Sequence, residues 1–424
     1  MQVHSNAVSD VGRVRDHNED AFLADEELGL FMVCDGMGGH ASGEVAAQMT
    51  IRTVQNYIRE RSNALRQVER GEAKPELLAQ FLSEAITIAS NEVNALGAAD
   101  RSKRGMGTTC CVLLVRGGKG AMGHVGDSRL YVHRGGLHQL SEDHTFVQEA
   151  LRHGVALAET SKYQNVLTRA VGTQKAVKVD TLAFDVLPGD TYLLCSDGLH
   201  KYTPDVADLS RALERDKLDT IAKGLIDLAN ERGGSDNVTA LVVRVEQTTQ
   251  PSPRAEKVEA DLYALRHIEL FADVNMAELV RLYAKFHERR AKSGEEIIHE
   301  DEVSSSLFVI VRGSMDVEKG KKAIATLSAG SHFGEMALLN LRPRTATVRA
   351  REDCQLLVLD REAFVTIIRE DAVLGVRLLW RLAATLSLRL DDTLLLQATH
   401  ATKTNEWAAV TQTFGTVPSP YLRK

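Results

Sequence analysis

The sequence has little of what a disulfide framework or a secretion signal requires. Its five cysteines form no CxxC pair and leave an odd one over, which is typical of reduced thiols in a cytosol. They are Cys34, Cys110, Cys111, Cys195 and Cys354. The N-terminal stretch MQVHSNAVSDVGRVRDHNED lacks the charged start and apolar core of a signal peptide. We therefore expect a cytoplasmic protein.

Uninterrupted apolar runs and a basic charge balance are also missing. The most apolar late segment, residues 373–396, carries regularly spaced arginines, and arginine is costly at a bilayer centre, so we expect a helix in water rather than a membrane span. The formal net charge is −7 and no long basic run is present, which argues against a nucleic-acid binder. We expect neither nucleic acid nor membrane as a partner.

The chain is long enough, at 424 residues, for two domains or more. Short apolar runs bounded by turn residues alternate with segments of helical periodicity, and residues 246–258 are polar and contain two prolines. We predict that this stretch is a linker. The predicted organisation is a first domain at 1–246, a linker at 247–258, a second domain at 259–398 and a loose tail at 399–424.

Acidic residues follow or precede several of the predicted strands in the first region. Asp35 and Asp197 each end a nearly pure apolar run, in VCDG and CSDG. Asp-Gly alone is a common turn, so each position by itself is a weak signal. Carboxylates that end buried strands are costly to bring together unless a cation neutralises them. An all-oxygen set of this kind favours Mg²⁺ or Mn²⁺ over zinc.

The motifs occur in one order along the chain: VRDHNED, VCDGMGGHASGE, GMGTT, GDSRLY, HTFVQEAL, NVLTRAVG, CSDGL and SDNVT. This set resembles the metal-dependent (PPM, type-2C) protein serine/threonine phosphatases of the bacterial branch, over about residues 5–246. The resemblance implies an α+β fold, a four-layer α-β-β-α sandwich, and hydrolysis of phosphoserine and phosphothreonine in proteins. A kinase is among the candidate substrates.

The resemblance also implies a role for each acid of the set. Asp35 would bridge two metal ions, the Gly36 carbonyl would bind one of them, and Asp197 and Asp236 would complete the other. Glu19 and Asp20 would act near the metals through water, Asp127 with Asp197 would hold a weaker third ion, and Arg15 would bind phosphate. The glycines after Asp35 are interpreted as letting backbone approach an ion.

Two ions close together would make hydroxide available near neutral pH, and an arginine fork suits a phosphate. Two departures from the family pattern affect the details. Met37 stands where many eukaryotic relatives have a histidine, which leaves the general acid open, and His40 is interpreted as a plain loop residue. Lys162-Tyr163 replaces a common His-Pro within the expected flap at 144–170, so substrate selection is open.

The second region contains GSHFGEMALLNLRPRTATV, residues 330–348, with Glu335 and Arg344 around an apolar middle. An acid could accept a hydrogen bond from a sugar hydroxyl, and an arginine could clamp the phosphate of the same ligand. A surface ion pair is the alternative for any isolated pair of this kind. The pair alone does not decide between them.

Its surroundings resemble the cyclic nucleotide-binding domain, a β jelly roll with flanking helices, over about residues 265–395. The matching stretches are SGEEIIHEDEVSSSLFVIVRGSMDV, LSAGSHFGEMALL, PRTATVRA and LLVLDREAF. The resemblance implies a pocket for cAMP or cGMP formed by Gly334, Glu335, Met336, Ala337, Arg344 and Thr345. Thr345 discriminates poorly between the two nucleotides. Asp301 replaces the usual turn glycine, and aspartate tolerates positive φ better than most residues.

The sequence therefore predicts a Mn²⁺- or Mg²⁺-dependent protein phosphatase regulated by a cyclic nucleotide. Two alternatives stay open: a silent phosphatase domain in a nucleotide-sensing scaffold, and an active phosphatase whose second domain only forms a homodimer through the helix predicted at 373–398. The identity of the substrate and the sign of regulation are not determined by the sequence.

Overall fold

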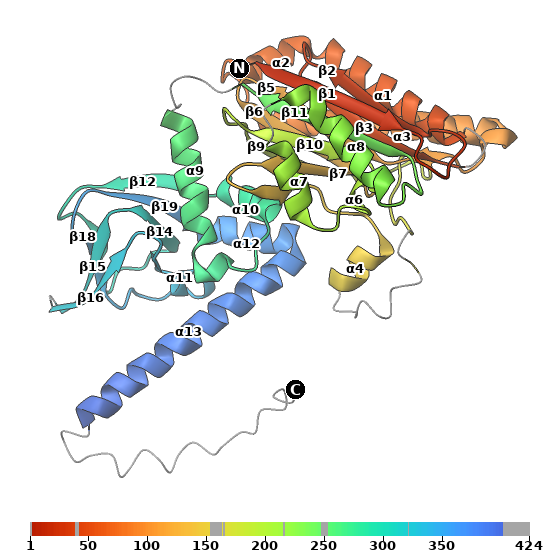
Figure 1. Cartoon of the computed structure of the whole chain (residues 1–424). Helices are drawn as coiled ribbons and strands as arrows, with labels where there is room; N and C mark the ends of the chain where they lie inside the picture. The colour runs from red at the N-terminus through yellow and green to blue at the C-terminus, as the bar shows by residue number, and fades with distance from the viewer. Residues whose placement is uncertain are drawn as a thin grey trace. The chain divides into compact units, whose positions relative to one another are not determined.

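The computed structural model describes residues 2–38, 42–152, 163, 166–214, 217–246, 253–320 and 322–401. The contacts divide the chain into two compact units, and most of their helices and strands are labelled in Figure 1. Unit 1 comprises residues 1–263 and 275–286, and unit 2 comprises 264–274 and 287–424.

Unit 1 contains two antiparallel sheets. One has five strands in the order β1-β11-β10-β7-β8, and the other has the order β2-β3-β5-β6-β9 with the short β4 paired to β3. The strands are β1 (Val3–Asp10), β2 (Asp20–Asp25), β3 (Leu30–Met37), β4 (Gly107–Thr108), β5 (Cys110–Arg116), β6 (Lys119–Val125), β7 (Arg129–His133), β8 (Leu137–Gln139), β9 (Asp180–Asp185), β10 (Thr191–Cys195) and β11 (Val238–Val245).

Alternation along the strands explains why the two sheets stack. On β3, Phe31 and Val33 join the core between the sheets, whereas Met32 and Cys34 face the helical layer beside the sheet. Successive strand side chains point to opposite faces, so a strand with both faces buried is apolar throughout. For this reason the residues of β3 before Asp35 form an unbroken apolar run in the sequence.

Helices cover both outer faces, which gives four layers. The helices of the first layer, coloured red to orange in Figure 1, pack on the sheet of β3, while α7 and α8 pack on the sheet of β11. The α-β-β-α arrangement predicted from the resemblance is confirmed. The helices of unit 1 include α1 (Ser42–Glu60), α2 (Ser62–Glu69), α3 (Glu76–Ala99), η1 (Arg101–Lys103), α4 (Phe146–Arg152), α6 (Asp197–His200), α7 (Val206–Leu213), η3 (Leu218–Thr220), α8 (Ile221–Glu231) and α10 (Met276–Tyr283).

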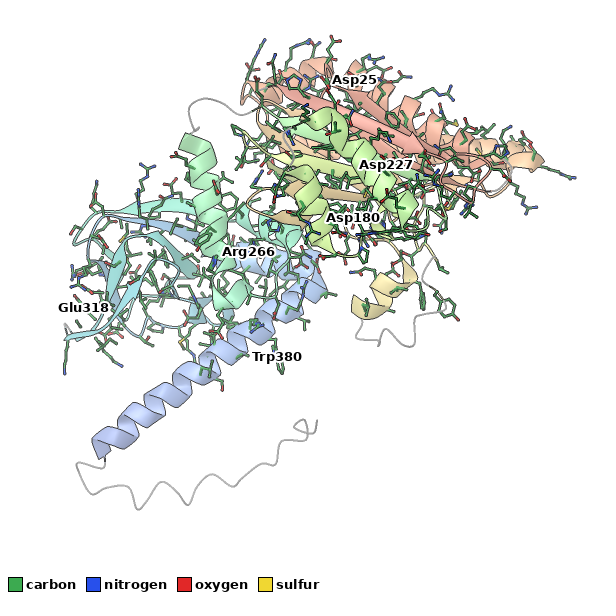
Figure 2. The ribbon with its side chains drawn as sticks, in the orientation of Figure 1. Asp25, Asp180, Asp227, Arg266, Glu318 and Trp380 are labelled. Carbon is green, nitrogen blue, oxygen red and sulfur yellow. The ribbon has the colours of Figure 1, made fainter. Side chains whose placement is uncertain are left out.

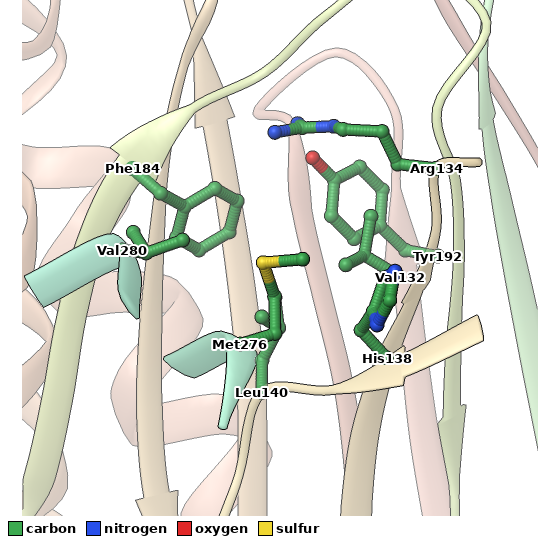
Figure 3. Close-up of a pocket in the computed structure, with 8 residues that line it drawn as sticks. All are labelled: Val132, Arg134, His138, Leu140, Phe184, Tyr192, Met276 and Val280. Atoms are coloured by element: carbon green, nitrogen blue, oxygen red, sulfur yellow. The ribbon is translucent and has the colours of Figure 1, made fainter. Parts of the chain in front are cut away.

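Helix α10 belongs to unit 1 although its neighbours in sequence belong to unit 2. Ala277 and Val280 of α10 join the core between the two sheets. Figure 3 shows Met276 and Val280 facing a pocket at this end of the core, whose lining residues are Val132, Arg134, His138, Leu140, Phe184, Tyr192, Met276 and Val280. The contacts thus assign 275–286 differently from the predicted boundaries at 246 and 259, and the functional limits of the two domains stay a prediction.

Unit 2 contains two four-stranded antiparallel sheets, in the orders β12-β19-β14-β17 and β13-β18-β15-β16. Its core includes Phe308, Met315, Val348 and Leu356, and two such sheets with flanking helices form the predicted jelly roll. The elements are η4 (Glu269–Phe271), β12 (His287–Ala291), β13 (Glu296–Ile298), β14 (Ser306–Arg312), β15 (Ser314–Lys319), β16 (Lys322–Ser328), β17 (His332–Phe333), α11 (Met336–Leu339), β18 (Thr347–Ala350), β19 (Cys354–Asp360), α12 (Arg361–Glu370) and α13 (Ala372–Ala401).

The predicted linker is partly helical. Helix α9 (Pro253–Arg266) begins inside the predicted stretch 247–258, because proline is well suited to the first position of a helix; residues 247–252 lie outside the described residues. The predicted tail is described only to residue 401, where α13 ends. Within the described residues, no helix combines the length and the apolar character needed to cross a membrane.

Candidate metal and nucleotide sites

The backbone of Asp35 is held from two sides by the GMGTT motif. The Asp35 N–H donates to Thr109 Oγ1 at 2.8 Å, and the Thr109 N–H donates to the Asp35 carbonyl at 2.8 Å. Thr109 Oγ1 also lies 2.7 Å from Ser128 Oγ in the GDSR motif. The end of β3, which carries Asp35, and the loop that carries Asp127 are therefore linked through two buried hydroxyls, those of Thr109 and Ser128.

Gly36 is required by a close approach of backbone to backbone. A Cβ at this position would lie 2.3 Å from the carbonyl of Gly43, at the start of α1, and 2.6 Å from the carbonyl of Glu19. The Gly36 N–H donates to that Glu19 carbonyl at 3.2 Å. Gly36 is interpreted from the sequence as letting backbone approach an ion, but the structure shows that it lets the start of α1 approach. The role of the Gly36 carbonyl as a ligand stays a prediction.

Asp20 connects β2 to the second sheet. It pairs with Asp35 across the β2–β3 register, and its Oδ2 accepts from Ser196 Oγ at 2.7 Å and from Thr239 Oγ1 at 2.6 Å. Its Oδ1 is buried and has no hydrogen-bond partner. An ionised oxygen buried in this way is costly unless a cation reaches it.

Asp197 and Asp127 come from two further segments of the chain. Asp197 begins α6 directly after β10, and its Oδ1 is also buried without a hydrogen-bond partner. Asp127 follows β6 and is 8% exposed, and its carbonyl lies 3.0 Å from His200 Nε2. His144 holds the same loop, because its Nδ1 accepts from the Gly126 N–H at 3.1 Å.

Asp236 and Arg15 form an ion pair, with Arg15 Nη2 at 3.0 Å from Asp236 Oδ2. The Arg15 side chain is 53% exposed, so its guanidinium is accessible to a ligand. Asn237 organises the loop that carries Arg15: its Oδ1 accepts from the Glu19 N–H at 2.9 Å, and its Nδ2 donates to the His17 carbonyl at 2.9 Å. Asn237 lies inside the SDNVT motif, and this role was missed from the sequence.

The carboxylates of these loops influence one another. Burial, followed by the charges of Asp20, Asp197, Asp127 and Asp236, raises the pKa of Asp35 well above its ordinary value. Burial also raises the pKa of Asp20 to about 7, with Asp197 and Asp236 adding to the effect against hydrogen bonds from Thr239 and Ser196. Burial and the charge of Asp197 raise the pKa of Asp127 to about 7. The structure therefore brings together acids that are far apart in the sequence.

The donor set fits divalent cations that prefer oxygen. Two buried carboxylate oxygens, on Asp20 and Asp197, have no hydrogen-bond partner, and mutual repulsion disfavours the charged acids. As the side chains stand, no group of three or more His, Cys, Asp and Glu among the described residues is positioned to hold a metal ion. Asp197 and Asp236 instead pair with Lys201 and Arg15. A cation at these two acids would have to compete with the side chains now paired to them.

Two cysteines neighbour these acids in sequence, Cys34 and Cys195, and both are fully buried in the helix-facing cores. Of the predicted flap, 144–170, residues 153–162, 164 and 165 lie outside the described residues, as does His40. Asp180, labelled in Figure 2, pairs at 2.8 Å with Nη1 of Arg169, which lies near the C-terminal end of the predicted flap.

In unit 2 the structure brings Glu335 and Arg344 to one place. Gly334 follows β17 with φ of 84°, Glu335 precedes α11, and the Arg344 Nη1 donates to the Gly334 carbonyl at 3.1 Å. Arg344 also donates from Nε to Ser304 Oγ at 2.7 Å and from Nη2 to the Ser306 carbonyl at 2.8 Å. Arg344 is 7% exposed, so the alternative of a surface ion pair does not describe it.

The remaining predicted pocket residues differ in exposure. Ala337 is buried at the start of α11, whereas Met336 and Thr345 are exposed. Burial lowers the pKa of Arg344 while the charges of Glu335 and Glu302 oppose that change. Asp301 has φ of 68°, which confirms that aspartate takes the conformation for which the family uses glycine.

Comparison with known proteins agrees with this geometry. The Protein phosphatase 2C family matches residues 13–241, and the Cyclic nucleotide-binding domain family matches residues 288–371. The Serine/threonine phosphatase stp of Listeria monocytogenes is 33% identical over 253 residues, which is 58% of this chain and 97% of that protein. The Serine/threonine protein phosphatase PstP of Mycobacterium tuberculosis is 36% identical over 243 residues, or 56% of this chain and 44% of PstP.

Two solved structures of PstP share the fold of the first region. One from Mycobacterium tuberculosis has a TM-score of 0.51 at 32% identity, covering 58% of this chain and 100% of that chain. The PstP catalytic domain in complex with two manganese ions has a TM-score of 0.50 at 33% identity, covering 58% and 99%. The chain therefore belongs to the protein phosphatase 2C family: it is a protein serine/threonine phosphatase that carries a C-terminal cyclic nucleotide-binding domain.

Proposed function

We propose that this phosphatase hydrolyses phosphoserine and phosphothreonine in proteins with two Mn²⁺ or Mg²⁺ ions held by Asp35, the Gly36 carbonyl, Asp197 and Asp236. Glu19 and Asp20 would act through water, and Asp127 with Asp197 would hold a weaker third ion. The observation that carries the proposal is a cluster of carboxylates in which neighbouring charges raise the pKa values of Asp35, Asp20 and Asp127, while one buried oxygen each of Asp20 and Asp197 lacks a hydrogen-bond partner.

Bound divalent ions would supply Lewis acidity and lower the pKa of an attacking water. The residues of the chain perform the other tasks. The Asp35 backbone is fixed by Thr109, so the point from which its side chain extends is held in place before any ligand arrives. Arg15 lies at the exposed edge of the cluster, where its planar fork can bind two phosphate oxygens and offset the charge that develops on them.

The test is hydrolysis of a phosphoserine or phosphothreonine peptide by the full chain in Mn²⁺. Asp35→Asn is expected to lower the metal-dependent rate by at least about 100-fold, because it removes the proposed bridging charge. Asp227→Asn is the matched control, since Asp227 is exposed on α8 and forms an ion pair with Lys223. Metal-dependent hydrolysis that survives Asp35→Asn would contradict the proposed site. If neither the wild type nor the variants hydrolyse the peptide in the presence of metal, the result would favour the silent scaffold.

We propose further that cAMP or cGMP binds unit 2 and changes the phosphatase activity. The buried Arg344 beside Gly334 and Glu335 supports this, because a guanidinium there can pair with a cyclic phosphate and a carboxylate can accept from a ribose hydroxyl. Regulation also requires that the nucleotide bind two arrangements of the protein unequally.

Calorimetry of the full chain with each nucleotide separates binding from regulation. Arg344→Gln is expected to abolish the heat of binding, whereas Arg342→Gln, at an exposed neighbour, is expected to retain it. Phosphopeptide hydrolysis measured with saturating nucleotide then tests regulation. Binding without any change in kcat or KM would remove the regulatory half of the proposal.

A second candidate role for unit 2 is formation of a homodimer through α13. Val376, Trp380 and Leu388 are 65%, 76% and 56% exposed, and Trp380 is labelled on α13 in Figure 2. Exposed apolar side chains on a helix can pack against a second copy. Sedimentation of the wild type and of Trp380→Glu tests this role.

Location in the cytoplasm is also proposed, and it is supported by five cysteines that are all unpaired and buried.

A further inference from the structure

A lysine that no predicted motif role includes lies at the edge of the acidic cluster. Lys201 follows α6, four residues after Asp197, and its Nζ forms an ion pair with Asp197 Oδ2. Its backbone N–H donates to the Asp197 carbonyl at 3.0 Å. The Lys201 side chain is 35% exposed and that of Asp197 is 12% exposed. The pair therefore lies at the edge of the cluster, reachable from water.

More than one acid acts on this ammonium group. Besides its ion pair with Asp197, the ammonium lies within electrostatic range of Asp127 and Asp236. It therefore lies on the side of the cluster that carries Asp127 and Asp197.

A divalent cation could bind Asp197 in two ways while Lys201 is present. The cation could bind Oδ2 after displacing the Lys201 ammonium, or it could bind Oδ1, which is buried without a hydrogen-bond partner, with the ammonium still close by. Either choice weakens binding, because like charges a few ångströms apart repel. The same conflict does not arise at Asp20, whose Oδ2 accepts hydrogen bonds from the neutral hydroxyls of Ser196 and Thr239.

We propose that Lys201 is a built-in counter-ion of the Asp127–Asp197 side of the cluster and competes there with divalent cations. By occupying Asp197 Oδ2 it sets the concentration at which the weakest metal position fills, and it limits the charge repulsion of the acids when that position is empty. This inference rests on the proposed metal site.

The experiment measures Mn²⁺ binding rather than activity. The full chain is purified in Mn²⁺ and titrated with a chelator, with free Mn²⁺ followed by electron paramagnetic resonance, so that a variant that needs metal to fold can still be measured. The variants are Lys201→Gln, which removes the charge, and Lys201→Arg, which keeps it. Lys223→Gln is the matched control, because Lys223 and Asp227 also form an i,i+4 ion pair, at 2.7 Å and with the lysine first, on the exposed face of α8.

Lys201→Gln is expected to lower the Kd of the weakest Mn²⁺ position by about tenfold, since a partly exposed pair exerts only a fraction of its full Coulomb energy. Lys201→Arg is expected to stay within about twofold of the wild type, and Lys223→Gln is expected to match it. In the metal-free state, Lys201→Gln is expected to lower the melting temperature, because the acids lose a counter-ion.

The role of Lys201 would be overturned if Lys201→Gln left the Kd for Mn²⁺ unchanged or raised it. The proposed metal site would remain intact in that case, provided that the wild type binds Mn²⁺ and Asp35→Asn abolishes the binding. No Mn²⁺ binding by the wild type would overturn both. The two failures are therefore distinguishable.

Discussion

His124 on β6 is a buried neutral imidazole, and its protonation should limit the stability of unit 1 in mild acid. The side chain is fully buried, its Nε2 lies 3.0 Å from the Glu142 carbonyl, and its Nδ1 has no hydrogen-bond partner. Burial, with the nearby ring of His144, lowers the pKa of His124 from 6.5 to about 3, against the opposing charges of Asp143 and Asp180. In the unfolded chain the same group should titrate near its ordinary value.

The sign follows from the two pKa values. Above pH 6.5 both states are neutral and His124 has no effect on the free energy of unfolding. Between about pH 6.5 and 3 only the unfolded state binds the proton, so stability falls as the pH falls, by about 1.4 kcal/mol per pH unit. Between pH 7.5 and pH 5 the loss from His124 alone is about 2 kcal/mol.

His124→Gln removes the titration and keeps an amide donor for the Glu142 carbonyl. The wild type and the variant are unfolded in urea at pH 7.5 and at pH 5, with chelator present in both. Both tryptophans, Trp380 and Trp407, lie outside unit 1, so fluorescence would report on the wrong part of the chain. Hydrogen exchange of peptides from residues 107–133, measured by mass spectrometry, reports on unit 1 instead.

Between pH 7.5 and pH 5, the free energy of unfolding of the variant is expected to fall by about 2 kcal/mol less than that of the wild type. This difference does not depend on the stability of the variant at pH 7.5. Other titrating groups are present in both proteins and cancel in the difference. An equal loss in both proteins would refute the reasoning, because it would mean that His124 is either protonated in the folded state or not protonated in the unfolded state.

Three further substitutions test particular contacts. Gly36→Ala is expected to destabilise unit 1 by about 3 kcal/mol or more in urea unfolding, because its Cβ would lie 2.3 Å from the Gly43 carbonyl and neither backbone can move freely. Asn237→Ala is expected to lower kcat/KM for a phosphopeptide by about tenfold to 100-fold, since the loop of Glu19 loses its side-chain acceptor; an unchanged kcat/KM would contradict this role. Asp301→Val is expected to lower the stability of unit 2 by about 1–3 kcal/mol, because a β-branched residue is strained at φ of 68°, whereas Asp301→Gly should change it by less than about 1 kcal/mol; calorimetric melting compares the two.

Most of the fold could be predicted because its elements depend on local pattern. The apolar runs before Asp35 and Asp197 became β3 and β10, and the periodic segment after Ser42 became α1. The turn conformation at Asp301 could also be expected from one residue and its neighbours. The start of α9 at Pro253 was missed, because a proline in polar surroundings indicates either a linker or the first turn of a helix.

Contacts between residues far apart in the sequence could not be predicted from local pattern. Lys201 carries no signal in sequence, and its ion pair with Asp197 arises because a short helix turns the lysine back onto the acid. Asn237 lay inside a recognised motif, yet its bonds to residues more than 200 positions earlier depend on β1 and β11 lying side by side. The membership of α10 in unit 1 depends on apolar contacts with strands far earlier in the chain.

The sequence by itself determined the two families, because their motifs are short stretches that occur in a fixed order along the chain, and the resemblance to those families implied the order of layers. Only the tertiary structure decided which charges meet: it brought five carboxylates from separate segments of the chain near one another, buried three of them, and paired two of the five with Lys201 and Arg15. The reason is physical, since electrostatic energy depends on distance and burial in space, and neither is a function of separation along the chain.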